Sequence, residues 1–115
     1  MSKGVGIERI AREIRSNDTF DDLAEVFSTL GSASRLRVLF LLQQQPDLGV
    51  GELAGLLGMT ISGASQHLRR LKNARLVCCR RDGHTVCCAL QGGSQHVRML
   101  RAVFGAIASE TGCCR

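Results

Sequence analysis

The stretch TISGASQHLRRLKNARLVCCRRDGHTVCCAL, residues 60–90, decides the fold of this chain. Its first half places apolar residues at the spacing of one helix face, and these are Ile61, Ala64, Leu68 and Leu71. Thr60 can cap this helix, because a threonine hydroxyl accepts a hydrogen bond from an N–H of the first turn. After Asn73 the pattern changes to a period of two, and Asp82-Gly83 is a strong signal for a tight hairpin. We therefore predict a helix followed by a two-stranded hairpin.

The net charge of the chain falls in the same stretch. The 115 residues include 15 Lys and Arg and 10 Asp and Glu, which gives a formal charge of +5. Residues 61–84 hold six basic residues and one acidic residue, whereas the other 91 residues hold nine of each. A polar helix face followed by a basic hairpin has the form of a DNA recognition helix plus a wing. The alternative is a basic face that contacts only solvent, and the concentration of the whole excess on two adjacent elements argues against it.

Length and composition limit the class of protein. A chain of 115 residues fits one domain, 1–115, and its hydrophobic content of 44% with only 3% aromatic residues allows a thin aliphatic core. No signal peptide is recognisable, and no apolar run approaches the roughly 20 residues of a membrane helix. We therefore expect a cytoplasmic protein without a membrane partner. Its six cysteines should then be mostly reduced thiols.

Hydrophobic periodicity predicts further helices on both sides of the central stretch. Four of them are 4–15, 19–30, 52–57 and 94–109, with a short strand at Val50 and a capping box of Thr19 with Asp22. The remaining one starts at Ser32 or Ser34 and ends at Pro46. The first and last helices carry apolar stripes larger than the core needs: Ile7, Ile10, Ile14, Val97, Leu100, Val103, Phe104 and Ile107. We therefore predict a mainly α (α+β) fold of five or six helices with a β-hairpin wing. The terminal helices should form a homodimer.

Four segments resemble the ArsR/SmtB family of winged helix-turn-helix transcriptional repressors. They are TLGSASRLRVLFLL, VGELAGLLGMT, SGASQHLRRLKNARLV and RRDGHTVCCAL, and the resemblance extends over residues 27–90. It implies a homodimer that binds double-stranded DNA at an imperfect inverted repeat, with the recognition helix in the major groove and the hairpin as the wing. The implied DNA-binding residues are Ser62, Ser65, Gln66, His67 and Arg69 in the helix and Arg80, Arg81 and His84 in the wing.

The sequence departs from the family pattern where inducers bind. Gly49 and Gly51 stand where one inducer site of the family has two cysteines. At a second family site only two of the four positions can ligate a metal, which is too few for tight tetrahedral zinc. Those four positions hold Ser94, His96, Ile107 and Glu110. Arg75 stands where many members have glycine, which costs about 1 kcal/mol if its φ is positive.

The six cysteines form three adjacent pairs, Cys78-Cys79, Cys87-Cys88 and Cys113-Cys114. If Asp82-Gly83 is the hairpin loop, Cys78 faces Cys87, while Cys79 and Cys88 point to the core as small apolar residues. Directly opposed Cα atoms are about 4.5–5.5 Å apart, within reach of a disulfide or a bridging soft metal. The pair near the C-terminus should lie on an exposed, mobile tail.

These patterns predict a DNA-binding repressor, not an enzyme. We expect a thiophilic inducer to bind cysteine thiolates and release the operator, with As(III) favoured over Cd(II), Hg(II) and Cu(I). The candidate ligands are Cys113, Cys114, Cys78 and Cys87. One alternative is a repressor that responds to oxidants through these thiols. Another is a winged-helix interaction module that does not bind DNA, and the basic hairpin argues against it. The chain has neither a C-x-x-C motif nor the Cys/His/Asn arrangement of a thiol enzyme.

Overall fold

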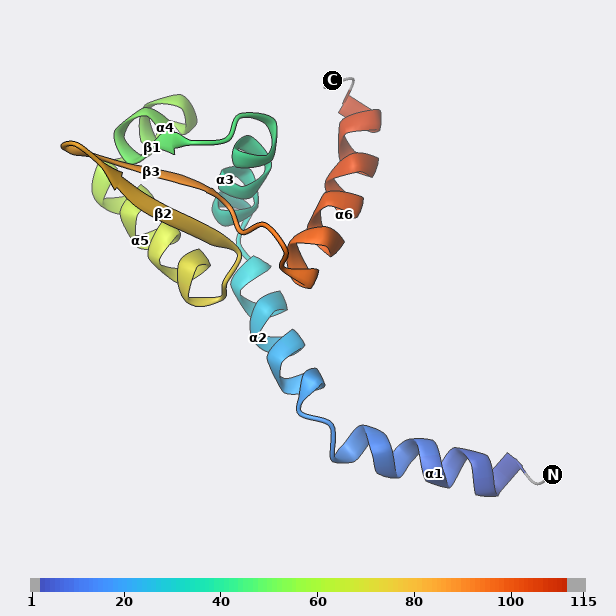
Figure 1. Ribbon diagram of the computed structural model, residues 1–115. Coiled ribbons are helices and arrows are strands. Elements are labelled where there is room, and N and C mark those ends of the chain that lie inside the picture. The colour runs from blue at the N-terminus through green and yellow to red at the C-terminus, as the bar shows by residue number, and fades with distance from the viewer. Residues whose placement is uncertain (1–2, 112–115) are drawn as a thin grey trace.

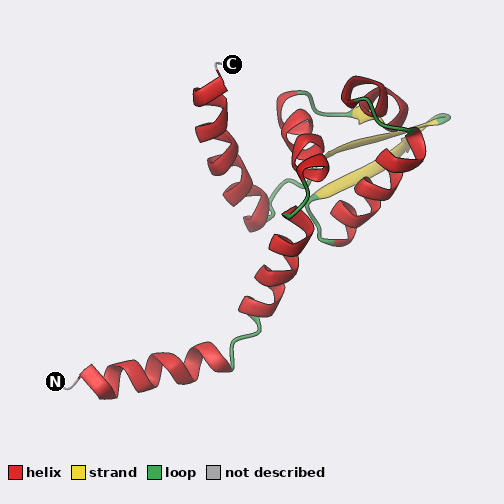
Figure 2. Ribbon diagram, turned by 180° about the vertical axis from the view of Figure 1, so that it is seen from behind, coloured by secondary structure: helices red, strands yellow, loops and turns green. Residues whose placement is uncertain are grey.

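The computed structural model describes residues 3–111, which form six helices and a three-stranded antiparallel sheet (Figure 1). The elements in chain order are α1 (Lys3–Arg15), α2 (Thr19–Leu30), α3 (Ala33–Gln44), β1 (Leu48–Gly49), α4 (Val50–Leu57), α5 (Ile61–Asn73), β2 (Val77–Asp82), β3 (Thr85–Leu90) and α6 (Gln95–Thr111). The helix pair α4–α5 and the hairpin β2–β3 form the predicted winged helix-turn-helix (Figure 2). No helix in this part of the chain is both long and apolar enough to span a membrane.

The core is built around α3, as its nearly continuous apolar sequence predicts. Val38, Leu39 and Leu42 are buried, and the helices around α3 contribute their own buried stripes. The Phe40 ring meets the Phe104 ring of α6 edge to face, with 5.3 Å between the ring centroids. This arrangement is a favoured geometry for two aromatic rings and holds the last helix against the body.

Two predicted helix starts are confirmed. The Thr60 Oγ1 accepts a hydrogen bond from the Gly63 N–H at 2.9 Å, and the Ser32 Oγ accepts one from the Arg35 N–H at 3.3 Å. The capping box at Thr19 is wrong, because Thr19 is already inside α2 and its N–H donates to the Asn17 Oδ1 at 2.9 Å.

The short strand also differs slightly from its prediction. It is Leu48–Gly49, and Val50 begins α4 instead. This strand pairs with β3, with Leu48 opposite Cys88, so it forms the edge of the sheet beside the hairpin. The edge pairing fixes the start of α4 relative to the wing.

The predicted hairpin loop is wrong by one residue, so the cross-strand partner of each strand residue is wrong by two. Asp82 pairs with Thr85, so the loop is Gly83-His84, and Gly83 has a φ of +68°. A two-residue loop favours glycine at its first position, where a positive φ is needed, and this preference outweighs the Asp82-Gly83 signal. Because both strands shift, every residue keeps its predicted face but has a new partner. Cys79 therefore lies opposite Cys88.

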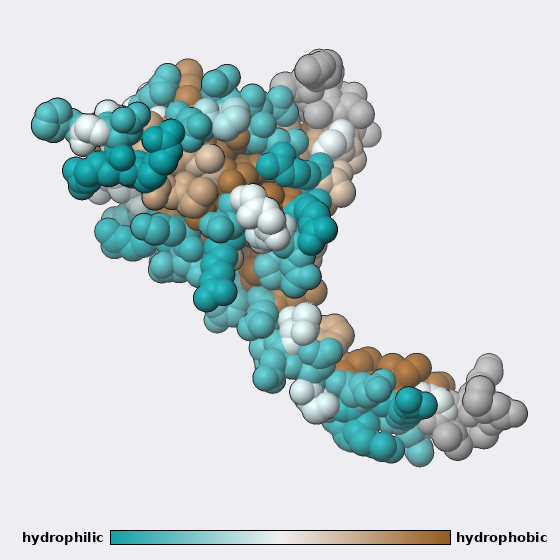
Figure 3. Space-filling model, in the orientation of Figure 1, coloured by the Kyte–Doolittle hydropathy of each residue, from teal (hydrophilic) through white to brown (hydrophobic). Residues whose placement is uncertain are grey.

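The molecule is elongated because α1 projects from the body (Figures 1 and 2). The chain extends over 62 × 31 × 22 Å with a radius of gyration of 17.7 Å, against about 13 Å for a compact chain of this length. Ile7, Ile10 and Ile14 are 61%, 55% and 48% exposed, and Figure 3 shows a hydrophobic band along α1. Further large apolar side chains are exposed on α2 and α6, namely Phe20, Phe27, Val103 and Ile107.

Candidate nucleic-acid interface

The helix α5 presents a polar face to solvent while its other face is anchored in the core. Ala64, Leu68 and Leu71 are buried, as predicted. Ser62, Gln66 and Arg69 are exposed, and Ser65 and His67 are half-buried on the flanks. Ser62 and Gln66 are four residues apart and therefore share one helix face. The side chains most suited to reading base edges are thus held on a rigid element.

Ile61 does not belong to the buried stripe, contrary to its prediction. Its side chain is 62% exposed, because it lies at the first position of α5, beyond the edge of the core. It lies beside Gly51 of α4, which has no side chain to cover it. The apolar period alone therefore overestimated the length of the buried stripe.

His67 has an environment that favours its neutral form. Burial, followed by the nearby charges of Arg35 and Arg70, holds the pKa of His67 below its ordinary value of 6.5. A neutral imidazole has one N–H donor and one acceptor, so His67 can contact a base edge or a phosphate without adding a charge.

The basic side chains of the wing are exposed around the hairpin. Arg80, Arg81 and His84 are all solvent-accessible, and Figure 3 shows hydrophilic side chains over the hairpin tip. Arg80 forms ion pairs with Asp47 at 3.4 Å and with Asp82 at 3.9 Å. Such exposed pairs contribute about 0–1 kcal/mol, so a phosphate can displace the carboxylates at little cost. Within residues 3–111, Arg81 has no carboxylate within ion-pair distance.

The ion pair between Asp47 and Arg80 has no counterpart among the sequence predictions. Asp47 has a φ of +60°, a conformation that aspartate tolerates better than most residues, and it follows Pro46 in the turn before β1. That Pro-Asp turn was the only local signal for the geometry. The partner, Arg80, lies 33 positions further along the chain, and no local pattern connects them.

A cavity of about 240 Å³ separates α5 from the hairpin. Its lining includes Ser65, Arg69 and Lys72 from α5, with Cys79 and Cys88 from the strands. Two of the predicted DNA-binding residues, Ser65 and Arg69, therefore lie on the flank of α5 that faces the wing. The structure thereby places the helix candidates on two sides of the helix, one outward and one beside the hairpin.

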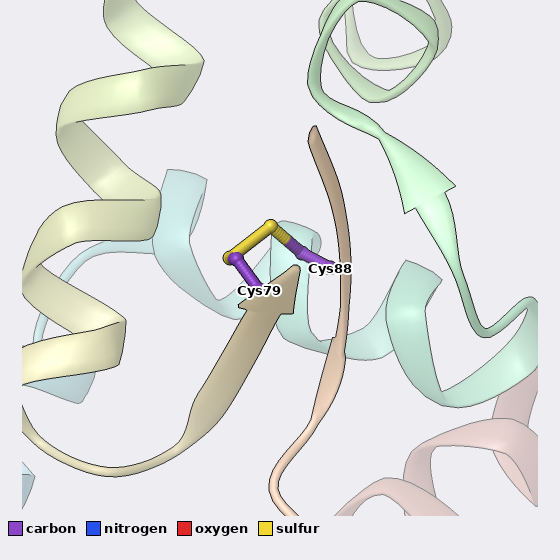
Figure 4. Close-up of a disulfide and its surroundings, with 2 residues drawn as sticks. All are labelled: Cys79 and Cys88. Carbon is purple, nitrogen blue, oxygen red and sulfur yellow. A yellow bond between two sulfur atoms is a disulfide. The ribbon is translucent and has the colours of Figure 1, made fainter. Parts of the chain in front are cut away.

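The cysteines are arranged differently from the prediction. Cys79 and Cys88 form a disulfide across the two strands, with their Cα atoms 4.1 Å apart (Figure 4). They were expected as free thiols, and the corrected register explains the difference because it places them directly opposite each other. Cys88 is otherwise buried in the core as predicted, with 1% of its surface exposed.

The predicted pairing of Cys78 with Cys87 is wrong for the same reason. Cys78 lies opposite Ala89 and Cys87 opposite Arg80, so the two free thiols are diagonal neighbours on one face of the hairpin. Diagonal residues are about 7–8 Å apart, farther than directly opposed ones. Cys113 and Cys114 lie outside the described residues. Between residues 3 and 111 there is no group of three or more His, Cys, Asp and Glu that could hold a metal.

Ser94, at one of the four positions of the second inducer site of the family, has a structural role here. The Ser94 Oγ accepts a hydrogen bond from the Val97 N–H at 3.4 Å, at the start of α6. His96 is half-buried and lines an open cavity of about 720 Å³ together with Asp22 and Glu25. Arg75, which also lines this cavity, has the positive φ that its position predicts, +61°.

Comparison with known proteins agrees with this geometry. The family described as "Bacterial regulatory protein, arsR family" matches residues 32–78, from α3 into β2. The solved homodimeric winged helix-turn-helix DNA-binding domain of Mb0332 from Mycobacterium bovis superposes with a TM-score of 0.69 at 31% identity, covering 83% of this chain and 87% of that one.

This chain belongs to the ArsR family.

Two curated relatives extend the comparison. The HTH-type transcriptional regulator KmtR of Mycobacterium tuberculosis is 43% identical over 86 residues, which cover 73% of this chain and 64% of KmtR. The cadmium resistance transcriptional regulatory protein CadC homolog of Staphylococcus aureus is 32% identical over 79 residues, 69% of this chain and 64% of the homolog. The chain thus spans just under two thirds of the length of these relatives, both of which are named as transcriptional regulators rather than enzymes.

Proposed function

We propose that this ArsR-family chain is a homodimeric transcriptional repressor that binds double-stranded DNA and is released by a thiophilic metal ion. The observation that carries the proposal is the exposed polar face of α5 beside the basic hairpin. Residues 61–84, which hold α5, the turn after it, β2 and the hairpin loop, carry the whole net charge of +5. Neutralising phosphates with lysine and arginine releases counterions and supplies most of the sequence-independent affinity for DNA.

A second copy of the chain is the partner that the exposed apolar stripes require. The stripes on α1 and α6 leave side chains such as Ile7, Ile10 and Val103 half-exposed or more in a single chain. The Mb0332 domain, which has the same fold, is homodimeric. Two copies related by a two-fold axis present two recognition helices. Their operator is then an imperfect inverted repeat, with half-sites about one helical turn, or a multiple of it, apart.

The DNA-binding residues divide into two roles by their place on the surface. Ser62 and Gln66 face outward on α5 and are the candidates for base contacts, since an amide can bond an adenine edge with two hydrogen bonds. Arg69 and Arg81 are candidates for phosphate contacts. The full proposed set is Ser62, Ser65, Gln66, His67, Arg69, Arg80, Arg81 and His84.

For the inducer we propose As(III), bound by thiolates. Cys113 and Cys114 are the main ligands, and Cys78 or Cys87 of either protomer supplies the third sulfur that pyramidal As(III) needs. Thiolates select soft ions of this kind, and the CadC relative is named for resistance to another of them, cadmium. To shift the ratio of DNA-bound to released protein from 99:1 to 1:99, the inducer must bind the released state more tightly by about 5.5 kcal/mol. Metal–thiolate bonds are strong enough for this, whereas one hydrogen bond is not.

Selection from a random library tests the DNA-binding proposal and identifies the operator in the same experiment. Purified full-length protein is incubated with duplexes that contain a random segment of about 40 base pairs, and the bound fraction is amplified and sequenced. We expect enrichment of an imperfect inverted repeat. A protein that retains no duplex at 50 mM salt would instead be the non-DNA-binding interaction module.

A further inference from the structure

We propose that Cys79 and Cys88 are a reversible dithiol–disulfide site, oxidised by a hydroperoxide, that controls how tightly α5 and the wing hold DNA. The proposal rests on the proposed DNA binding and adds a site distinct from the tail cysteines. It is carried by the disulfide, the cavity beside it and the basic residues that line that cavity.

The two cysteines are accessible to different degrees. Cys79 is half-buried, and Cys88 is 1% exposed. Both line the cavity of about 240 Å³, which is large enough for a small oxidant. Cys79, the more accessible of the two, is therefore the thiol that meets the oxidant, and Cys88 is the one that closes the disulfide.

Basic side chains in the cavity favour the reaction of Cys79 with a hydroperoxide. Arg69 and Lys72 line it from α5. The reactive form of cysteine is the thiolate, and neighbouring cations favour that form. Cys78 and Cys87 are on the opposite face of the sheet, away from Arg69 and Lys72, and the arginine opposite Cys87, Arg80, is ion-paired with Asp47 and Asp82.

Oxidation of the pair needs the hydroperoxide as its only co-reactant. The Cys79 thiolate attacks the outer oxygen of the hydroperoxide, an S–O bond forms, the O–O bond breaks, and the leaving alkoxide takes a proton to become an alcohol, or water in the case of hydrogen peroxide. The Cys88 thiolate then attacks the Cys79 sulfur. The S–S bond forms, the S–O bond breaks, and hydroxide leaves and is protonated to water. Two thiols lose two electrons and two protons in total.

A disulfide here is more consistent with switching than with structural support. A protein that binds chromosomal DNA in a bacterium works where thiols are kept reduced, and disulfides there are usually transient, catalytic or redox-sensing. The bridge closes a segment of the chain with a sequence separation of only nine residues, which the β2–β3 pairing already holds together.

Arg69 couples the redox state of Cys79 and Cys88 to DNA binding. In the disulfide form the sulfurs carry no charge, so Arg69 and Lys72 are available to phosphates. Two molecules of a small thiol reduce the bridge by thiol–disulfide exchange and leave as their own disulfide, and this reduction places an anionic Cys79 thiolate in the same cavity, where it pairs with these cations. We therefore infer that the disulfide form binds DNA more tightly. The dithiol form should bind about one phosphate fewer per protomer.

The chemical part is tested on the reduced full-length protein with one equivalent of hydrogen peroxide. Free thiols are then alkylated and the peptides are mapped by mass spectrometry. We expect a cross-linked peptide joining Cys79 to Cys88. The matched control is Cys78→Ser/Cys87→Ser, which removes the thiols on the opposite face of the same strands and should form the same cross-link at the same rate. A disulfide at any other pair, or no disulfide, overturns the proposal.

The functional part uses Cys78→Ser/Cys87→Ser/Cys113→Ser/Cys114→Ser, in which only the proposed pair remains. Its affinity for the selected duplex is measured by fluorescence anisotropy, with the variant either peroxide-treated or reduced by a phosphine. We expect the reduced form to bind roughly tenfold more weakly at 0.15 M salt, with a log K against log salt slope shallower by about two per dimer. In Cys79→Ala/Cys88→Ala the two treatments should give equal affinity.

The outcomes separate this proposal from the proposed function. Equal affinity of the oxidised and reduced forms, with the cross-link confirmed, overturns the switch and leaves DNA binding intact. Absence of DNA binding in both forms instead overturns the proposed function, and the peptide map still decides whether the site forms. Because that map is read on the wild-type chain, it does not depend on whether a variant folds.

Discussion

Single residues of α5 and the wing should differ in what they contribute to DNA binding. Gln66 is exposed on the outward face of a helix fixed by Leu68 and Leu71, whereas Arg81 is on a hairpin strand without an ion-pair partner in the described part of the chain. A base contact discriminates between sequences, and a phosphate contact does not. The two residues therefore allow a direct test of the proposed roles.

Gln66→Ala should relax the preference at one base pair of each half-site, and removing a bidentate base contact should cost about 1–3 kcal/mol. Arg81→Ala should weaken binding to all duplexes alike and make the salt slope shallower by about one for each phosphate that is no longer bound. Anisotropy titrations on the selected duplex and on duplexes with a single substitution distinguish these effects. Uniform weakening by Gln66→Ala would disprove the assignment of α5 as the base-reading element.

Arg75 has a left-handed conformation that glycine adopts without a steric penalty. Its φ is +61°, in the turn between α5 and β2. Arg75→Gly should therefore raise the free energy of unfolding by about 1 kcal/mol, measured by urea denaturation at one fixed protein concentration. Arg75→Ala is the control, since it removes the same side chain but keeps a Cβ. If both variants gained the same free energy of unfolding, the effect would come from removal of the charge rather than from the backbone conformation.

His67 should make stability depend on pH. Because burial and two arginines lower its pKa in the folded chain, the unfolded chain binds the proton more readily. The contribution of His67 to stability is therefore complete above the unfolded pKa of about 6.5 and is lost as the pH falls through the lower folded pKa. Urea denaturation between pH 8 and pH 5 should show this loss in the wild type and less of it in His67→Gln. If the free energy of unfolding changed with pH by the same amount in both proteins, His67 would not be the source of the pH dependence.

At the level of elements, the local patterns of the sequence predicted most of what forms. The helix α5 begins at the cap that Thr60 predicts, and α3 is buried as its apolar run predicts. The predictions failed where two local signals competed or where distant residues meet. The hairpin register depended on whether Gly83 takes the first or second loop position, and the Arg80–Asp47 pair joins segments far apart in the chain. For the same reason the disulfide was not predicted, since moving the loop by one residue moved each cross-strand partner by two and placed Cys79 opposite Cys88.

The projecting helix α1 should be a dimerisation element. Ile10 lies in the middle of its exposed apolar stripe, with 55% of its surface accessible in the single chain. Ile10→Glu places a charge in the proposed interface and should give a monomer at micromolar concentration in sedimentation velocity. Arg12→Glu is the matched control, because Arg12 is two residues further along the helix and faces the opposite side. If Ile10→Glu were still a dimer, α1 would not be part of the interface.

For the whole molecule, the proposed inducer must connect the tail to the DNA-binding surface. The described residues hold no group of three His, Cys, Asp or Glu that could bind a metal. The As(III) site proposed above therefore combines Cys113 and Cys114 with a third thiolate. The helix α6 leads directly to this pair and carries part of the exposed stripe proposed for the dimer interface. A metal bound between the tail and the hairpin of either protomer would therefore change the relative orientation of the two recognition helices.

Cys113→Ser/Cys114→Ser should retain full affinity for the selected duplex but fail to release it when arsenite is added. Release is followed by anisotropy, with Cd(II) and Zn(II) titrated in parallel, and Cys78→Ser/Cys87→Ser is the variant that tests the hairpin as the source of the third sulfur. If the tail variant no longer bound DNA, the pair would be structural. If it released DNA as the wild type does, the sensor would have to be elsewhere, and the hairpin thiols would be the next candidates. Removal of arsenite by a competing dithiol should restore binding of the wild type, because the thiolate ligands are not consumed in the reaction.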